Sequence, residues 1–166
     1  MPHINLKEHY QFVTFRTKES TDTYLKKLYG SNEPEKLKQY KIDAYLDDSN
    51  SGAYLNGKIV SEIKKYFLNY DDKIYKLLAL TVMPNHIHIL FQQKDELKNI
   101  MRILKGGSAH IVNKSLDKKG QVWASDYFDK LIRDETHLSI TYEYIKNNAN
   151  RAGLLDANIR FYGCYE

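Results

Sequence analysis

The stretch Ile-Tyr-Lys-Leu-Leu-Ala-Leu-Thr-Val-Met-Pro-Asn-His-Ile-His-Ile-Leu-Phe, residues 74–91, decides the fold. Residues 74–82 are nearly continuously apolar, which is typical of a central strand buried on both faces. Met-Pro-Asn at 83–85 interrupts this strand, and the six residues that follow alternate, so that His86 and His88 face the same way. Two strands joined by three residues predict an antiparallel hairpin.

Patterns on either side of the hairpin predict the remaining elements. Residues 11–17 are rich in β-branched and aromatic side chains and predict a first strand. Apolar residues at helical spacing predict helices over about 57–68 and 135–149, and a further helix that Asp95 caps and Gly106-Gly107 bends. We also expect a short helix and two extended segments, at 22–29, 121–123 and 128–132. This order favours an α+β fold, a ferredoxin-like sandwich in which helices cover an antiparallel sheet.

The length of the chain, 166 residues, fits one domain with its own core. From Gly30 to Asn56 the hydrophobic pattern loses its period, and Gly, Asn, Ser, Asp and Pro accumulate. We interpret residues 30–56 as a loop-rich excursion from a single domain that spans residues 1–166.

Composition excludes several classes of protein. The chain is 42% hydrophobic and 28% charged, and it contains no apolar run of the roughly 20 residues that a membrane-spanning helix needs. Its N-terminus is polar where a signal peptide would be apolar, so we expect a cytoplasmic protein. The single cysteine, Cys164, excludes an internal disulfide and a multi-cysteine zinc site. A net charge of +4 permits binding to nucleic acid without requiring it.

The histidine pair is the first candidate site. On a strand, residues two apart have Cα atoms roughly 7 Å apart and side chains on one face, so His86 and His88 can share one divalent metal. In an arbitrary His-x-His sequence the commoner arrangement is one packed ring and one solvated ring. A metal site therefore requires further ligands.

The helix expected over 135–149 offers a second group. Tyr144 and Asn148 lie four residues apart and share a helix face, which differs from the face of Leu138, Tyr142 and Ile145. A nearby metal and an aligned phosphate favour the phenolate of a tyrosine during nucleophilic attack, and an asparagine offers a carbonyl oxygen to the same metal. Taken singly, Tyr144 fits packing and Asn148 fits a helix C-terminus, so the candidate depends on the combination with the histidines.

The sequence resembles the REP-associated tyrosine transposases, a group of single-tyrosine HUH transposases of the IS200-like family. Residues 82–90, Val-Met-Pro-Asn-His-Ile-His-Ile-Leu, resemble the HUH motif. The order and spacing of later segments match from Tyr75 to Leu155, and residues 12–17 fit as well, whereas 30–56 do not align. The family usually has proline after the asparagine of its tyrosine motif, and this chain has Ala149, which predicts a helix longer by a residue or two.

The resemblance implies cutting of single-stranded DNA beside a hairpin through a covalent 5′-phosphotyrosine. We expect Tyr144 to attack and His86, His88 and Asn148 to bind Mg²⁺ or Mn²⁺, with Mn²⁺ the stronger activator in vitro. The expected partner is single-stranded DNA with hairpin-forming repeats, bound by a monomer or homodimer and without a membrane. Four basic residues near the site are candidates for phosphate contacts: Arg16, Lys105, Lys130 and Arg133.

Two other functions stay open. One is a domesticated protein that binds hairpin DNA without transposition, although the joint presence of His86, His88, Tyr144 and Asn148 argues against loss of cutting. The other is a hydrolase or oxygenase in which two histidines and a carboxylate bind zinc or iron. The sequence places no carboxylate at the Asn148 position, which ranks this alternative lower.

Overall fold

An antiparallel sheet of five strands forms the centre of the computed structural model, which describes residues 9–20, 27–28, 30–48 and 50–166. The strands lie in the order β4-β1-β3-β2-β5, and each neighbouring pair is antiparallel. The first four follow the 4-1-3-2 order of a ferredoxin-like sandwich, so the predicted fold class is confirmed. Their bounds are β1 Tyr10–Arg16, β2 Tyr75–Val82, β3 His86–Gln93, β4 Phe128–Leu131 and β5 Phe161–Gly163.

The hairpin of β2 and β3 is the predicted one, and its alternation separates the two faces of the sheet. Ile87, Ile89 and Phe91 belong to the main hydrophobic core, together with residues of the helices on that side. Leu90 packs in a smaller cluster on the opposite face, with Phe12 of β1. Since His86 and His88 alternate with the isoleucines, they lie on this second face.

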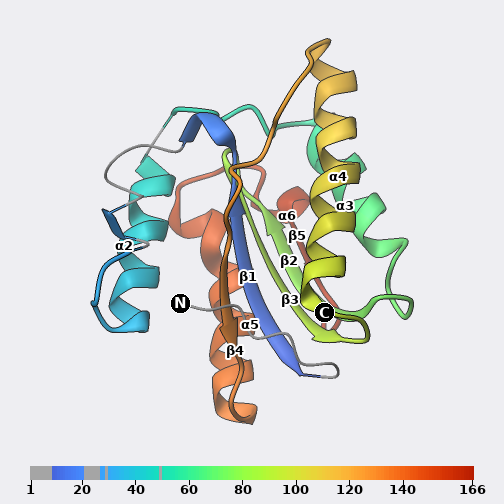
Figure 1. Cartoon of the computed structure of the whole chain (residues 1–166). Coiled ribbons are helices and arrows are strands. Elements are labelled where there is room, and N and C mark those ends of the chain that lie inside the picture. Colours follow the sequence, from blue (N-terminus) through green and yellow to red (C-terminus); the bar gives the residue numbers. More distant parts are fainter. Residues whose placement is uncertain (1–8, 21–26, 29, 49) are drawn as a thin grey trace.

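Helices cover both faces of the sheet (Figure 1). On the side of the main core lie α3 (Lys58–Leu68) and α4 (Leu97–Leu116), and on the side of the histidines lie α2 (Glu35–Asp48) and α5 (Glu135–Arg151). The short helices η1 (Lys18–Ser20) and α6 (Ala157–Arg160) complete the described elements. None of the helices within the described ranges has the length and apolar character needed to cross a membrane.

Helix α4 corrects one expectation, because it runs unbroken through Gly106 and Gly107. Gly107 serves close packing: a Cβ atom placed there would lie 1.9 Å from Cζ of Tyr66. The Tyr66 hydroxyl, on α3, donates a hydrogen bond of 2.8 Å to the carbonyl oxygen of Ile103. Because Gly107 has no side chain, Tyr66 of α3 packs closely against α4 at this position, and the helix does not bend there.

The interpretation of residues 30–56 as loop-rich is wrong at the centre of that range, where residues Glu35–Asp48 form helix α2. Ile42 and Leu46 are buried and pack with Leu28 and with Phe128 of β4. The buried side of α2 also carries polar residues, among them Gln39 and Asp43, and this mixture hides the helical period in the sequence. Of the short helix expected over 22–29, only residues 27–28 lie within the described part of the chain, and they are helical.

Candidate active site

The two histidines lie side by side on β3. Both are completely buried, and their ring centroids are 4.8 Å apart. Nδ1 of His86 lies 2.7 Å from Oδ1 of Asn85, and Nδ1 of His88 lies 2.7 Å from Oγ1 of Thr14 on β1. Within the described residues, neither Nε2 atom has a hydrogen-bond partner. The predicted common direction of the two rings is confirmed.

Burial also decides the charge of these rings. It lowers the pKa of His86 to about 3, and burial, the neighbouring His86 and Arg151 lower the pKa of His88 well below its usual value. Both imidazoles are therefore neutral near pH 7. Because the amide oxygen of Asn85 only accepts hydrogen bonds, Nδ1 of His86 is the donor, and its Nε2 keeps the lone pair with which a histidine binds a metal.

Tyr144 stands on α5 and faces the histidines. Asp134 caps this helix by accepting a hydrogen bond of 2.7 Å from the backbone N of His137. The Tyr144 ring centroid lies 5.8 Å from that of His88, and the guanidinium carbon of Arg151 lies 4.5 Å from the Tyr144 ring centroid. Sequence reasoning missed Arg151, although its distance of seven residues from Tyr144 places it on the same helix face.

Arg151 lies beside Tyr144 because α5 continues to this residue. The helix extends two residues beyond the predicted end at 149 and includes Arg151. Ala149, unlike a proline, keeps a backbone N–H in the helix, and the helix continues through Arg151.

Asn148 lies on the same face of α5, between Tyr144 and Arg151 in sequence. Its side chain is completely buried, yet neither its Oδ1 nor its Nδ2 has a hydrogen-bond partner among the described residues. An unpaired buried amide destabilises a protein by about 1–3 kcal/mol. The face of α5 that meets the histidines thus carries polar atoms that packing alone does not explain.

Two carboxylates that sequence reasoning missed come from α2. Oδ1 of Asp43 lies 3.7 Å from Nε2 of His88, and Oδ1 of Asp47 lies 3.8 Å from Nε2 of His86. Burial, with a smaller effect of Asp47, raises the pKa of Asp43 well above its usual value. They were missed because their segment was interpreted as a loop. Position 148 carries no carboxylate, as the sequence shows, but α2 brings two carboxylates near the histidines from another part of the chain.

These groups do not form a ready-made site of acidic and imidazole ligands. Across the described ranges, no three His, Cys, Asp or Glu side chains are grouped closely enough to hold a metal ion. Each carboxylate instead faces one histidine. The donor set of two neutral imidazoles and a buried amide oxygen nevertheless fits a divalent ion, because these atoms have no other hydrogen-bond partner in the described part of the chain.

The four predicted phosphate contacts lie in different places. Arg16 is 1% exposed, and its guanidinium pairs with Asp126 at 3.1 Å, so its surroundings do not support that role. Lys105 extends from α4 and donates a hydrogen bond of 2.7 Å to the carbonyl oxygen of Ala124. Lys130 lines a cleft beside Tyr144, whereas Arg133 is exposed and lines a different pocket.

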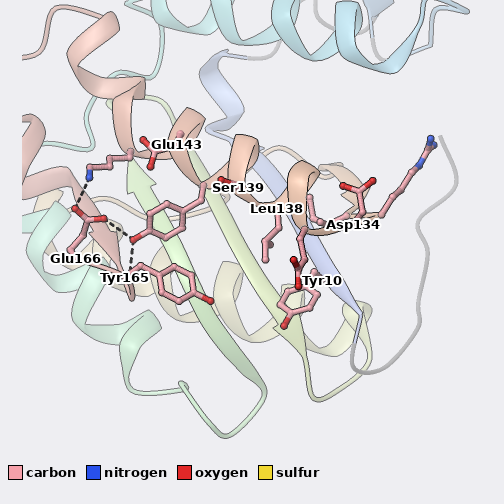
Figure 2. A pocket seen from close by; sticks show the side chains of 12 residues that line it. Tyr10, Asp134, Leu138, Ser139, Glu143, Tyr165 and Glu166 are labelled. Carbon is pink, nitrogen blue, oxygen red and sulfur yellow. Dashed lines mark hydrogen bonds and ion pairs between the residues drawn. The ribbon is translucent and has the colours of Figure 1, made fainter.

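Two hollows flank α5. The cleft beside Tyr144 has a volume of about 370 Å³ and lies between α2, α5 and the sheet. A larger pocket of about 760 Å³ lies along residues Tyr142, Glu143 and Lys146 of the same helix and reaches Tyr165 and Glu166 (Figure 2). The larger pocket contains neither the histidines nor Tyr144. The arrangement of reactive groups therefore identifies the candidate active site, and pocket volume does not.

Comparison with known proteins supports a transposase. A sequence model described as "Transposase IS200 like" matches residues 48–148, a range that includes both histidines, Tyr144 and Asn148. A solved REP-associated tyrosine transposase bound to a REP hairpin has a TM-score of 0.54 and 15% identity over 94% of this chain and 75% of that chain. A putative transposase from Deinococcus radiodurans R1 has a TM-score of 0.49 and 17% identity over 89% and 93% of the two chains. No curated protein sequence matches the chain.

The solved REP-associated transposase shows that the fold of this chain occurs in a transposase. The sequence match goes further, because it covers most of the chain and all the residues of the histidine, tyrosine and asparagine motifs. The chain therefore belongs to the IS200-like transposase family, whose activity is the cleavage and transfer of DNA.

Proposed function

We propose that this transposase cuts and rejoins single-stranded DNA near hairpins, with a divalent metal and through a covalent 5′-phosphotyrosine on Tyr144. The observation that carries the proposal is the position of Tyr144, whose ring centroid lies 5.8 Å from that of His88 and on the helix face of the unpaired Asn148 amide. Hairpin DNA is favoured because the structurally similar REP-associated transposase was solved bound to a REP hairpin.

The proposed metal ligands are Nε2 of His86, Nε2 of His88 and Oδ1 of Asn148. All three side chains are completely buried, and in the described residues these atoms lack hydrogen-bond partners. Thr14 and Asn85 hold the opposite ring nitrogens, which orients both imidazoles before an ion binds. A bound Mg²⁺ or Mn²⁺ supplies positive charge beside a non-bridging oxygen of the scissile phosphate.

Tyr144 is the proposed nucleophile. Its oxygen forms a bond to phosphorus as the bond to the 3′ oxygen breaks, its proton passes to solvent, and the departing 3′ oxygen takes up a proton to become a hydroxyl. The guanidinium of Arg151, 4.5 Å from the ring centroid, places a positive charge beside the group that becomes negative during attack. The reverse reaction rejoins the strand.

The cleft beside Tyr144 is the proposed path of the DNA strand. Lys130 and Arg151 supply positive charge there, and the largely exposed Tyr40 supplies an aromatic face. Grooves that combine cations with aromatic side chains bind unpaired nucleotides by phosphate attraction and base stacking. Lys130 is therefore the predicted phosphate contact that we retain for this strand.

The test is incubation of the protein with labelled single-stranded hairpin DNA and Mn²⁺, followed by denaturing electrophoresis. We expect a labelled covalent adduct when the label is in the fragment on the 3′ side of the scissile phosphate, because that fragment stays joined to Tyr144 through its 5′ phosphate, and we expect loss of the adduct in EDTA. Binding of the hairpin without any adduct would reject the enzyme and support the domesticated DNA-binding protein instead.

A further inference from the structure

We propose that helix α2 is a lid over the two histidines, and that it moves away from β3 before DNA is cut. This inference rests on the proposed function, because it concerns how the DNA phosphate reaches the groups named there. Helix α2 ends at Asp48, where the match to the transposase family begins, so the family match does not account for this helix.

The reactive groups are closed off from the surface. The side chains of His86, His88 and Asn148 are 0% exposed, and their Nε2 and amide atoms are buried. A phosphate oxygen that binds at these atoms, directly or through an ion, has to approach them to within contact distance. Part of the protein therefore has to move before a strand can be cut.

Helix α2 is the element that covers these groups without carrying any of them. The histidines are on β3, and the proposed nucleophile and the buried amide are on α5. Oδ1 of Asp43 lies 3.7 Å from Nε2 of His88, and Oδ1 of Asp47 lies 3.8 Å from Nε2 of His86. Both distances are too long for a hydrogen bond, so the carboxyl groups occupy the space beside the two nitrogens without bonding to them. Movement of α2 frees that space for a phosphate.

The apolar contacts of α2 form a cluster of their own. Figure 1 shows α2 as the outermost helix on the histidine side of the sheet. Its buried Ile42 and Leu46 pack with Leu28 and Phe128 in a small cluster that is separate from the main core. Nδ2 of Asn85 also donates a hydrogen bond of 2.9 Å to the carbonyl oxygen of Leu46. Segments with few buried apolar contacts open locally, so α2 can separate from the sheet while the main core stays folded.

Polar atoms on the inner side of α2 favour its displacement. Oε1 of Gln39 and Oδ2 of Asp43 are buried, and neither has a hydrogen-bond partner among the described residues. Water hydrates both atoms in an open state, which lowers the free energy of opening. Gln39 and Tyr40 also line the cleft beside Tyr144, so displacement of α2 widens the proposed path of the strand toward the histidines.

The experiment measures how readily the histidines become accessible in the full chain, in EDTA and without DNA. Diethyl pyrocarbonate acylates neutral imidazole, and peptide mass spectrometry gives the rate at each histidine. Leu46→Ala removes apolar contacts of α2 and should raise the rate at His86 and His88 by about tenfold or more. Leu104→Ala makes the same substitution in the main core and should leave these rates within about twofold of the wild type. The exposed His110 is the internal reference.

A milder second variant covers the case in which Leu46→Ala fails to fold. Ile42→Val should raise the same rates about threefold. Equal increases in Leu46→Ala and Leu104→Ala would overturn the lid, because the histidines would then become accessible only by global unfolding. Unchanged rates in both α2 variants would also overturn it, as would wild-type histidines on β3 that react as fast as His110.

Adduct formation separates the lid from the proposed function. Leu46→Ala should form the DNA adduct in Mn²⁺ at least as fast as the wild type, because opening precedes cutting. Slower adduct formation by this variant would overturn the lid, since the closed position of α2 would then belong to the active enzyme. Absence of an adduct in the wild type would reject the proposed function, whereas the histidine rates would still report whether α2 opens.

Discussion

Helix α5 separates two tyrosine environments that differ in how their polar atoms are paired. On one side, the Tyr142 hydroxyl donates a hydrogen bond of 2.9 Å to Glu166 and accepts one of 3.1 Å from the backbone N of Tyr165. Glu166 also pairs with Lys146 at 2.8 Å (Figure 2). On the other side, beside Tyr144, the histidine Nε2 atoms and the Asn148 amide have no hydrogen-bond partners among the described residues.

This contrast shows where the protein maintains a destabilising arrangement. The polar atoms around Tyr142 satisfy one another, as in an ordinary structural contact. Each unpaired buried polar group beside Tyr144 destabilises the fold by about 1–3 kcal/mol, an arrangement expected where a ligand or a reaction needs the free atoms. The fully paired side has the larger pocket, so pocket volume and unpaired polar atoms indicate different sides of α5.

The largest expected effect is the loss of the covalent DNA adduct when the hydroxyl group of Tyr144 is removed. Removal of the Tyr142 hydroxyl group, on the other side of α5, is the matched comparison. Tyr144→Phe should abolish the covalent DNA adduct, because phenylalanine has no oxygen to bond to phosphorus. Tyr142→Phe should retain the adduct and lower the free energy of unfolding by about 1 kcal/mol through loss of its hydrogen bonds. Denaturing electrophoresis and urea unfolding measure the two effects.

The two substitutions remove the same atom from tyrosines two residues apart, so general damage to the helix would affect both variants. An adduct in Tyr144→Phe, or its loss only in Tyr142→Phe, would show that the nucleophile is assigned to the wrong side of α5.

Substitution of either histidine should have the next largest effect. His86→Ala or His88→Ala should reduce cutting by about 100-fold or more, because the charge stabilisation of a bound metal is worth several kcal/mol. Hairpin affinity should stay within about tenfold of the wild type, since phosphate and base contacts elsewhere provide most of the binding. Cleavage kinetics and filter binding measure the two quantities, and undiminished cutting by either variant would show that the pair is structural.

Asn148→Leu should affect activity and stability in opposite directions. Cutting should fall roughly tenfold or more because an oxygen ligand is lost. In EDTA the free energy of unfolding should rise by about 1 kcal/mol, because leucine replaces a buried amide without partners. Asn147→Leu, at an exposed position of the same helix, controls for helix propensity. If the Asn148→Leu protein were less stable in EDTA than the wild type, the Asn148 amide would have to make stabilising hydrogen bonds. That result would contradict the prediction.

The smallest expected effect lies on the Tyr142 side. Hydrogen bonds from Lys146 and Tyr142 lower the pKa of Glu166 below its ordinary value of 4.5. A lowered pKa in the folded state means that the stabilisation is present above the ordinary pKa and is lost as the pH falls through the folded value. Glu166→Gln should therefore lower the melting temperature at pH 7, and the difference from the wild type should shrink as the pH falls below 4.5. Reduced adduct formation by Glu166→Gln would contradict the comparison, because it would show that the Tyr142 side of α5 also contributes to DNA cleavage.

Much of the fold follows from local patterns. The bounds of β2, β3, α3 and α5 lie within about two residues of prediction because their apolar spacing is regular. The alternation of residues 86–91 also predicts the common direction of the histidines. Helix α2 was not predicted, because polar residues occupy part of its buried side and its hydrophobic period is therefore weak.

The sequence by itself determined the antiparallel hairpin, the shared face of His86 and His88, and the shared face of Tyr144 and Asn148. Each of these depends on the geometry of a single element or of two adjacent strands. Only the tertiary structure decided that α2 brings Asp43 to the histidines and that Arg16 is buried against Asp126. Those contacts join segments far apart in the chain, and their distances depend on how the helices pack on the sheet, which no local spacing encodes.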